Sequence, residues 1–239
     1  MSTSSTPKKP LPHQTSPMPH PFRSARLTYT TPDWTTTLSP HTSPASADDA
    51  FFHALNSNYT GLANAYPGLL KPVGTKDVSE LKKFLEGCLL SVLMCIGRAT
   101  GAVDTDGQDE TELVRIGELH LSGPPPHAAH HRRAMDSINM LPEWQGQGYG
   151  SEAIEWVLEW GFLRAGLHRI GIGAFEWNPR AVALYQRLGF VLEGRSREAF
   201  FFEGEWYDGI ELAMLDREWR AIKEKKMKKK DEEEHPFAF

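Results

Sequence analysis

The sequence predicts an α/β fold built on one central sheet. Three observations lead to this prediction. Strand and helix patterns alternate along most of the 239 residues, a glycine-rich turn at residues 145–151 joins an apolar stretch to an amphipathic segment, and the pair Asn178-Pro179 begins a second helix. With 24% charged and 40% hydrophobic residues, the composition is typical of a soluble globular chain with one domain of ordinary size.

The first half of the chain contains two predicted helices between predicted strands. Asp48 and Asp49 favour a helix start because they complement the helix dipole, and Gly87 favours a helix end. The expected elements are a strand at 23–30, helices at 47–56 and 77–85, and strands at 88–98 and 113–121. The polar residues 104–110 should form the hairpin turn between the last two strands. They carry Asp-Thr-Asp-Gly, but no Glu closes the ~12-residue loop that a calcium site needs.

The second half alternates more regularly. We expect a strand at 135–142, a helix at 148–165, a strand at 168–175, a helix from Asn178 to Gly189, and two strands within 190–215. In the strand at 168–175, Ile170, Ile172 and Ala174 share one face, opposite Gly171 and Gly173. The predicted order is therefore β, α, α, β, β, β, α, β, α, β, β.

Composition divides the chain into three parts. Residues 1–21 are rich in Ser, Thr and Pro and should be a disordered tail, residues 22–219 should form the folded domain, and residues 220–239 should form a charged C-terminal tail. Six lysines fall within residues 223–230 and an acidic run follows at 231–234. A charged helix end is the favoured interpretation, and a nuclear-localisation patch is the alternative.

Several classes of partner are not expected. The net charge of −5 gives no general attraction to nucleic acid, and the longest apolar run, 88–97, is far shorter than the roughly 20 residues of a membrane span. Cys88 and Cys95 lie on one predicted strand and should not pair, which favours a reducing cytoplasmic location. His127, His130 and His131 lack Cys or carboxylate partners at useful spacing, so no metal site is expected.

The glycine-rich turn indicates a cofactor with phosphates. Backbone N–H groups at the start of a helix can bind phosphate at the positive end of the helix dipole. A Walker loop would require Gly-Lys-Ser/Thr, and a Rossmann turn would require a glycine where this chain has Ser151. The remaining option is the acetyl-coenzyme A turn of the GNAT N-acetyltransferases.

Two segments carry a resemblance to that family. Gln145 to Gly150 matches its pattern Arg/Gln-x-x-Gly-x-Gly/Ala, and residues 176–190 resemble its Asn-containing strand end, Tyr-bearing helix and final Gly-Phe. Residues 193–219 are similar to the RimJ/RimL or spermidine acetyltransferase branch. The resemblance covers residues 22–219. It implies a GNAT fold with a mixed, mostly antiparallel sheet and helices on both faces.

The resemblance also implies an activity. A GNAT enzyme moves an acetyl group directly from acetyl-CoA, as co-substrate and without a metal, to a primary amine of a polyamine or other small amine, a peptide N-terminus or a lysine. The alternative from another class is a non-catalytic acyl-CoA-binding or sensing domain. A homodimer is also considered.

The expected cofactor site follows from the matched motifs. Backbone amides of residues 146–150 would hold the pyrophosphate, Met140 and Leu141 would pair with the pantetheine amides, and Asn178 would cap its helix and bond the pantetheine arm. Ala181 stands where the family usually has Ser. The complete expected set is Met140, Leu141, Gln145, Gly146, Gln147, Gly148, Tyr149, Gly150, Ser151, Asn178, Ala181 and Tyr185.

The catalytic groups are less clearly marked. By resemblance, Tyr185 protonates the departing coenzyme A thiolate, a role that suits a phenol; a buried structural Tyr is the alternative. In one branch of the family, a Glu that acts as the general base stands where this chain has Ala134. Asp136 and Glu118 are therefore the first candidates for the general base, followed by His120 and Glu176; each could instead be a solvated or salt-bridged strand residue. The loops 123–133 and 195–207 are expected to line the acceptor site.

Overall fold

The computed structural model describes residues 24–32, 47–103 and 109–234. These residues form a seven-stranded sheet with the order β1-β2-β3-β4-β5-β7-β6. All neighbouring strands are antiparallel except the parallel pair β4 and β5. The strands are β1 (Thr28–Thr30), β2 (Leu90–Val103), β3 (Asp109–Ser122), β4 (Arg133–Met140), β5 (Arg169–Phe175), β6 (Val191–Phe202) and β7 (Glu205–Leu215).

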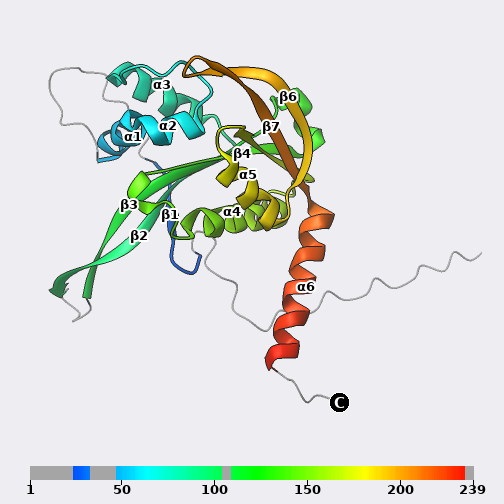
Figure 1. Cartoon of the computed structure of the whole chain (residues 1–239). Helices are drawn as coiled ribbons and strands as arrows, with labels where there is room; N and C mark the ends of the chain where they lie inside the picture. Colours follow the sequence, from blue (N-terminus) through cyan, green and yellow to red (C-terminus); the bar gives the residue numbers. More distant parts are fainter. Residues whose placement is uncertain (1–23, 33–46, 104–108, 235–239) are drawn as a thin grey trace, which may run out of the picture.

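Helices cover both faces of this sheet (Figure 1). On one face, α1 and α3 pack on β2 around Phe52, Leu85 and Leu93. On the other face, α4 and α5 cover the larger core, to which α6 adds Trp219. The helices are α1 (Ala47–Ser57), α2 (Tyr59–Ala65), α3 (Thr75–Glu86), α4 (Tyr149–Glu159), α5 (Pro179–Leu188) and α6 (Asp216–Glu234). The predicted mixed, mostly antiparallel sheet between two helical layers is confirmed.

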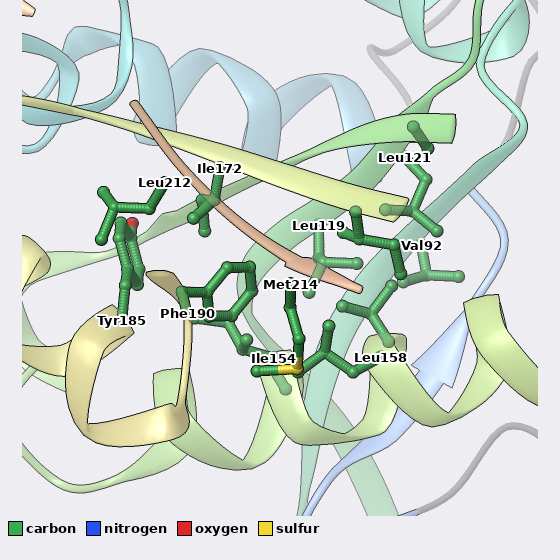
Figure 2. Packing of buried hydrophobic residues seen from close by; sticks show 14 of the residues in the cluster. Val92, Leu119, Leu121, Ile154, Leu158, Ile172, Tyr185, Phe190, Leu212 and Met214 are labelled. Carbon is green, nitrogen blue, oxygen red and sulfur yellow. The ribbon is translucent and has the colours of Figure 1, made fainter. Parts of the chain in front are cut away.

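The larger core explains how α4 packs on the sheet. Ile154, Val157 and Leu158 recur at helical spacing and are buried against strand residues such as Leu119 and Met214 (Figure 2). The regular helix ends at Glu159, and a short π-helical segment, Trp160–Arg164, continues it where a longer α-helix was expected. In β5 the predicted apolar face is buried; of the two glycines on the opposite face, Gly173 is exposed and Gly171 is buried.

Some expected boundaries are wrong. The first strand is only Thr28–Thr30, because the donors of Ser24, Arg26 and Leu27 bind Glu152 of α4. Helix α2 was not predicted, and Cys88 precedes β2 rather than lying in it. Strand β4 ends at Met140, because Pro142–Trp144 forms a 3-10 turn. The register Val103↔Asp109 confirms the β2–β3 hairpin, whose residues 104–108 lie outside the described residues.

The parallel strands β4 and β5 pair only at their beginnings. Their register runs from Arg133↔Arg169 to Asp136↔Ile172, while β4 continues along β3 as far as Gly117↔Met140. The two strands therefore separate toward their carboxyl ends. Helix α2 contacts both strands, and Trp177 Nε1, just beyond β5, donates to the carbonyl of Ala63 in α2 at 3.2 Å.

The charged C-terminal segment is helical through residue 234, so the expected domain boundary after residue 219 falls inside α6. Lys223 and Lys226 of the lysine run pair with Glu159 and Glu155 of α4 at 2.9 and 2.6 Å. The expected tail at residues 1–21 lies outside the described residues. Within the part of the chain that is described, no helix is long and apolar enough to cross a membrane.

Candidate active site

The glycine turn lies directly after β4 and supplies the start of α4. Gly146 and Gly148 have φ values of 74° and 88°, in the left-handed region that glycine tolerates best. Gly148 is also the N-cap of α4, and it has no side chain with which to cap the helix. The N–H groups of the first helical turn are therefore left for another acceptor, and residues 145–148 are exposed. This cradle fits the phosphates of a nucleotide-like group.

Two arginines flank the turn, and sequence reasoning missed both. Arg26 Nη1 donates to the carbonyl oxygen of Gln147 at 3.0 Å, and its guanidinium lies 4.4 Å from the ring centroid of Tyr149. Arg180 Nη2 would lie 3.6 Å from a Cβ at residue 146. No sequence signal marked Arg26, because more than a hundred residues separate it from the turn that it contacts. The turn thus has side-chain cations beside its backbone donors.

Glu152 holds Arg26 in this place. Its carboxylate accepts hydrogen bonds from Ser24 Oγ at 2.6 Å, from the Arg26 backbone N–H at 2.6 Å and from Arg26 Nε at 2.8 Å. Burial opposes ionisation of Glu152, but these hydrogen bonds and the charge of Arg26 outweigh it, so the pKa of Glu152 is lowered. An ionised Glu152 therefore ties the segment before β1 to the first turn of α4.

Gln145 shapes the entry to the turn. Its Nε2 donates to the carbonyl of Met140 at 2.9 Å. The N–H of Leu141 donates to Ile116 of β3, and its carbonyl accepts from Trp144. Because backbone groups alternate along a strand, the N–H and C=O groups of Met140 point toward the β5 side of β4, at a position where the two strands no longer pair. Of the two residues expected to pair with pantetheine, Met140 is thus the one whose backbone faces the gap between the separated ends of β4 and β5.

Asn178 and Tyr185 lie on α5, on the other side of that gap. Asn178 accepts from the N–H of Ala181 at 3.3 Å, so it caps α5 as predicted, and Ala181 is half-buried. Tyr185 is 7% exposed at one end of the large core, beside Phe190 (Figure 2). Burial first, and then the charge of Asp136, raises the pKa of Tyr185. The phenol is therefore protonated at neutral pH and can act as an acid.

Glu118 and His120 form a buried pair on β3. Glu118 Oε2 and His120 Nδ1 are 3.1 Å apart, and Phe84 of α3 meets the imidazole ring edge-on. Burial lowers the pKa of His120, but the hydrogen bond and charge of Glu118 and the charge of Asp136 outweigh it, so the net shift is upward. Glu118 is paired with Asn139 of β4, near the point where β4 ends.

Asp136 lies on the opposite face of the sheet from this pair. It is opposite Leu121 and Ile172, whose side chains belong to the core under α4, whereas Glu118 is opposite Leu93, in the core under α1 and α3. Burial raises the pKa of Asp136 to about 7, with the charge of His120 opposing the rise. The structure therefore does not bring the two leading base candidates together.

Glu176 has structural partners. Arg195 Nη2 donates to it at 2.6 Å, and the backbone N–H of Asp208 donates to its other oxygen at 3.0 Å. These bonds connect the end of β5 to β6 and β7. The alternative interpretation of Glu176, a salt-bridged strand residue, matches this geometry.

The two loops expected to line an acceptor site lie at different ends of the sheet. The loop 123–133 leads into β4. Its residues, including Arg133, border a cavity of about 290 Å³ together with Met135 and Arg169, at the end where β4 and β5 are paired. The segment 195–207 is mostly strand, and its hairpin tip lies at the open end. There Tyr59 of α2 donates to Glu203 at 3.0 Å.

Aromatic rings line that open end. Trp177 stacks on Phe175 and Phe202 with centroid separations of 4.4 and 4.7 Å and meets Tyr207 edge-on at 5.2 Å. Phe202 stacks in turn on Tyr59. On the β6–β7 hairpin, four acidic residues lie toward the tip, namely Glu198, Glu203, Glu205 and Asp208, whereas Glu193 pairs with Arg169 at the other end. The open end is thus aromatic and acidic. Among the described residues, no group of three or more metal-ligating side chains gathers.

Comparisons with known proteins agree with this geometry. The profile of the Acetyltransferase (GNAT) family matches residues 95–190. A spermidine N(1)-acetyltransferase of Escherichia coli K12 is 28% identical over 130 residues, which are 54% of this chain and 60% of that protein. The spermidine N(1)-acetyltransferase of Vibrio cholerae is 36% identical over 89 residues, 37% of this chain and 51% of that protein. The chain thus spans between half and three fifths of the length of these curated relatives.

A solved structure extends the similarity to most of the fold. The crystal structure of a Vibrio cholerae spermidine N-acetyltransferase in complex with CoA and spermine covers 82% of this chain and 99% of its own, with a TM-score of 0.59 and 24% identity. At that identity the likeness concerns the fold. Together with the family profile and the curated relatives, it shows that the chain is similar to GNAT acetyltransferases and has their fold.

Proposed function

We propose that this protein is an N-acetyltransferase that transfers an acetyl group from acetyl-CoA directly to a primary amine. The observation that carries the proposal is the separation of β4 from β5 immediately before an exposed, left-handed glycine turn. That arrangement leaves backbone donors, an unpaired strand edge and a buried phenol around one gap. The names of the curated relatives, both acetyltransferases, support the same activity.

Residues of the turn would hold the co-substrate. The N–H groups of residues 146–151 and the guanidinium groups of Arg26 and Arg180 would bind its phosphates, because both are donors directed at the same exposed cradle. The backbone of Met140, on the open edge of β4, would bind its amide-containing arm as a neighbouring strand would. Asn178 would add its side-chain amide at the start of α5. When bound, acetyl-CoA supplies the activated acetyl group.

Two side chains would handle protons. Tyr185 would donate its hydroxyl proton to the departing sulfur. Glu118 would take the proton that the attacking amine must lose, directly or with His120 as its hydrogen-bonded neighbour, because it lies beside the end of β4 on the face that α2 approaches. Asp136 is enclosed on the other face, so Glu118 is the better placed of the two predicted bases.

We further propose that the acceptor is a small polycation. The open end of the gap is bordered by the aromatic rings of Tyr59, Trp177 and Phe202 and by the acidic β6–β7 hairpin. Aromatic faces and carboxylates attract ammonium groups, and an acidic rim disfavours acidic peptides. Two relatives are named as spermidine acetyltransferases, which favours a polyamine over a protein substrate. The homodimer considered above stays a prediction.

The test is thiol release from acetyl-CoA in the presence of polyamines, aminoglycosides and N-terminal peptides. The expected result is release with polyamines and little with acidic-terminus peptides. Glu118→Gln should remove the acid limb of the pH profile of kcat/KM. Tyr185→Phe should lower kcat with little effect on acetyl-CoA affinity. Acetyl-CoA binding without release on every amine would instead support a non-catalytic acyl-CoA-binding domain.

A further inference from the structure

The guanidinium of Arg26 lies over the glycine turn with one end free. Its Nε and Nη1 donate to Glu152 and to the carbonyl of Gln147 at 2.8 and 3.0 Å, and no described residue accepts a hydrogen bond from Nη2. A Cβ at residue 148 would lie only 3.1 Å from this Nη2. Since Gly148 is the N-cap of α4, the free end of Arg26 lies beside the unpaired N–H groups of the first helical turn. The side chain is therefore placed to share an anion with the turn.

Glu152 holds both the backbone and the side chain of Arg26. Its Oε1 accepts from Ser24 Oγ at 2.6 Å and from the backbone N–H groups of Arg26 and Leu27 at 2.6 and 3.2 Å, while Oε2 accepts from Arg26 Nε. Nearly half of the Arg26 side chain is exposed, so without these bonds it would be free to move. Fixing an arginine before its ligand arrives lowers the entropy cost of binding. The carboxylate thus orders a cation beside the turn in advance.

The charge of Glu152 by itself counts against an anion at this turn. Glu152 lies in the first turn of α4, four residues after Gly148, which is roughly 6 Å along the helix axis. Burial opposes its ionisation, but the hydrogen bonds of Ser24 and Arg26 and the charge of Arg26 outweigh burial and lower the pKa of Glu152. An ionised carboxylate at that distance repels a phosphate bound to the turn. Any benefit of Glu152 to phosphate binding must therefore act through the Arg26 that it holds.

We propose that Glu152 is a positioning residue for the co-substrate, which keeps Arg26 over the glycine turn and thereby makes residues 24–27 part of the phosphate-binding site. This role rests on the proposed acetyltransferase function and concerns only the binding step. A purely structural tie between this segment and α4 would support stability and leave the affinity for coenzyme A unchanged. A direct charge effect would make binding tighter once the carboxylate is removed. The three roles therefore predict different changes in affinity when Glu152 loses its charge.

The central experiment measures the Kd of coenzyme A by calorimetry for the wild type, Glu152→Gln, Arg26→Gln and the double variant. Gln keeps the size of Glu and removes its charge. We expect Glu152→Gln to raise the Kd about fivefold, because the ligand itself must then order Arg26. In the Arg26→Gln background the same change should leave the Kd unchanged or lower it, because only a repulsive charge is removed. This difference between the two backgrounds identifies Arg26 as the group through which Glu152 acts.

Glu155→Gln is the matched control. Glu155 lies one turn further along α4 and pairs with Lys226 of α6 at 2.6 Å. This variant removes the same charge from the same helix, so its Kd should stay at the wild-type value. Thermal unfolding of both variants measures any loss of stability separately from affinity. At saturating acetyl-CoA, the kcat of Glu152→Gln should stay close to that of the wild type, since the proposed role ends once the co-substrate is bound.

A second readout uses the wild type alone and so does not depend on the folding of any variant. If residues 24–27 help to bind coenzyme A, bound coenzyme A must in turn stabilise them. Hydrogen exchange of the Arg26 and Leu27 N–H groups, which donate to Glu152, should therefore slow at saturating coenzyme A, and more than exchange in the β2–β3 hairpin.

Three results would each overturn the positioning role: an unchanged or lower Kd in Glu152→Gln, additive losses in the double variant, or unchanged exchange at Arg26 and Leu27. Coenzyme A binding with the expected pattern but without thiol release on any amine would instead overturn the acetyltransferase function and leave the positioning role standing. A wild-type chain that does not bind coenzyme A would overturn both.

Discussion

Arg26 and Gln147 join the segment before β1 to the glycine turn. The Nη1 of Arg26 donates to the carbonyl oxygen of Gln147 at 3.0 Å, while its Nε donates to Glu152 at 2.8 Å. One guanidinium thereby bridges the turn and the first turn of α4. Half of the Arg26 side chain remains exposed, so it can reach an anion held by the turn.

Replacing this guanidinium should weaken co-substrate binding. Arg26→Gln is expected to raise the KM for acetyl-CoA about tenfold with little change in kcat, because a charge-assisted hydrogen bond contributes about 1.5 kcal/mol. The defect should shrink at high salt, since screening weakens the wild-type contact as well. Steady-state kinetics at two ionic strengths measures both effects. The control is Arg98→Gln. Arg98 lies on β2 and forms an exposed ion pair with Glu112 of β3, so its replacement should change neither KM nor kcat.

A methyl group at Gly148 should disturb the turn in two ways. Its φ of 88° costs an alanine about 1–2 kcal/mol, and the new Cβ would lie 3.1 Å from Arg26 Nη2. Gly148→Ala should therefore lose stability and also raise the KM for acetyl-CoA. Gly101 has a φ of 78° but no described atom within 4 Å of its Cβ position. Gly101→Ala should thus lose stability similarly and keep a normal KM; a raised KM in this variant would show that strain alone is responsible.

Asp136→Asn should change how stability depends on pH. The pKa of Asp136 is about 7 in the folded chain and about 3.8 when exposed. Between these values the folded state binds the proton more tightly, so the free energy of unfolding falls as pH rises from about 4 to 7. The accumulated loss corresponds to about 4 kcal/mol. Denaturant unfolding should therefore show that the free energy of unfolding of the Asn variant, relative to that of the wild type, is higher at pH 8 than at pH 4.

Asp77 provides a control of opposite sign. The side-chain hydrogen bond from Lys71 and the backbone N–H of Gly74 lower the pKa of Asp77. Its contribution to stability is present above its ordinary pKa and disappears as pH falls. Asp77→Asn should therefore reduce stability at neutral pH and have no effect in acid. If both variants changed stability in the same direction at pH 8, the assigned pKa shift of Asp136 would be wrong.

Trp177 should matter for the acceptor rather than the donor. Trp177→Ala removes the ring that stacks on Phe175 and Phe202, so we expect a loss of about 3 kcal/mol in stability and a raised KM for polyamines. Trp177→Phe keeps a ring but loses the hydrogen bond to Ala63, which should cost about 1 kcal/mol. Bisubstrate kinetics distinguishes the two constants. An increase in the acetyl-CoA KM alone would contradict an acceptor role for this cluster.

Local signals made much of the fold predictable. Asn178 and Gly189 marked both ends of α5 because one residue caps with its side chain and the other adopts a left-handed conformation. Apolar spacing identified α4 and the two faces of β5. Helix α2 was missed because seven residues offer less than two full apolar turns. The end of β4 was misplaced by two residues because Leu141 continues the apolar pattern after the strand has ended.

The sequence by itself determined the motif-level features of this protein: the glycine turn, its place between a strand and a helix, and the capped helix that carries Tyr185. These depend on backbone conformations that a few neighbouring residues impose. The tertiary structure decided what gathers around the turn. It brought Arg26 to Gln147 across more than a hundred residues, and strand register placed Glu118 and Asp136 on opposite faces of the sheet. Such relationships arise from strand pairing and packing between distant segments, and no local pattern encodes them.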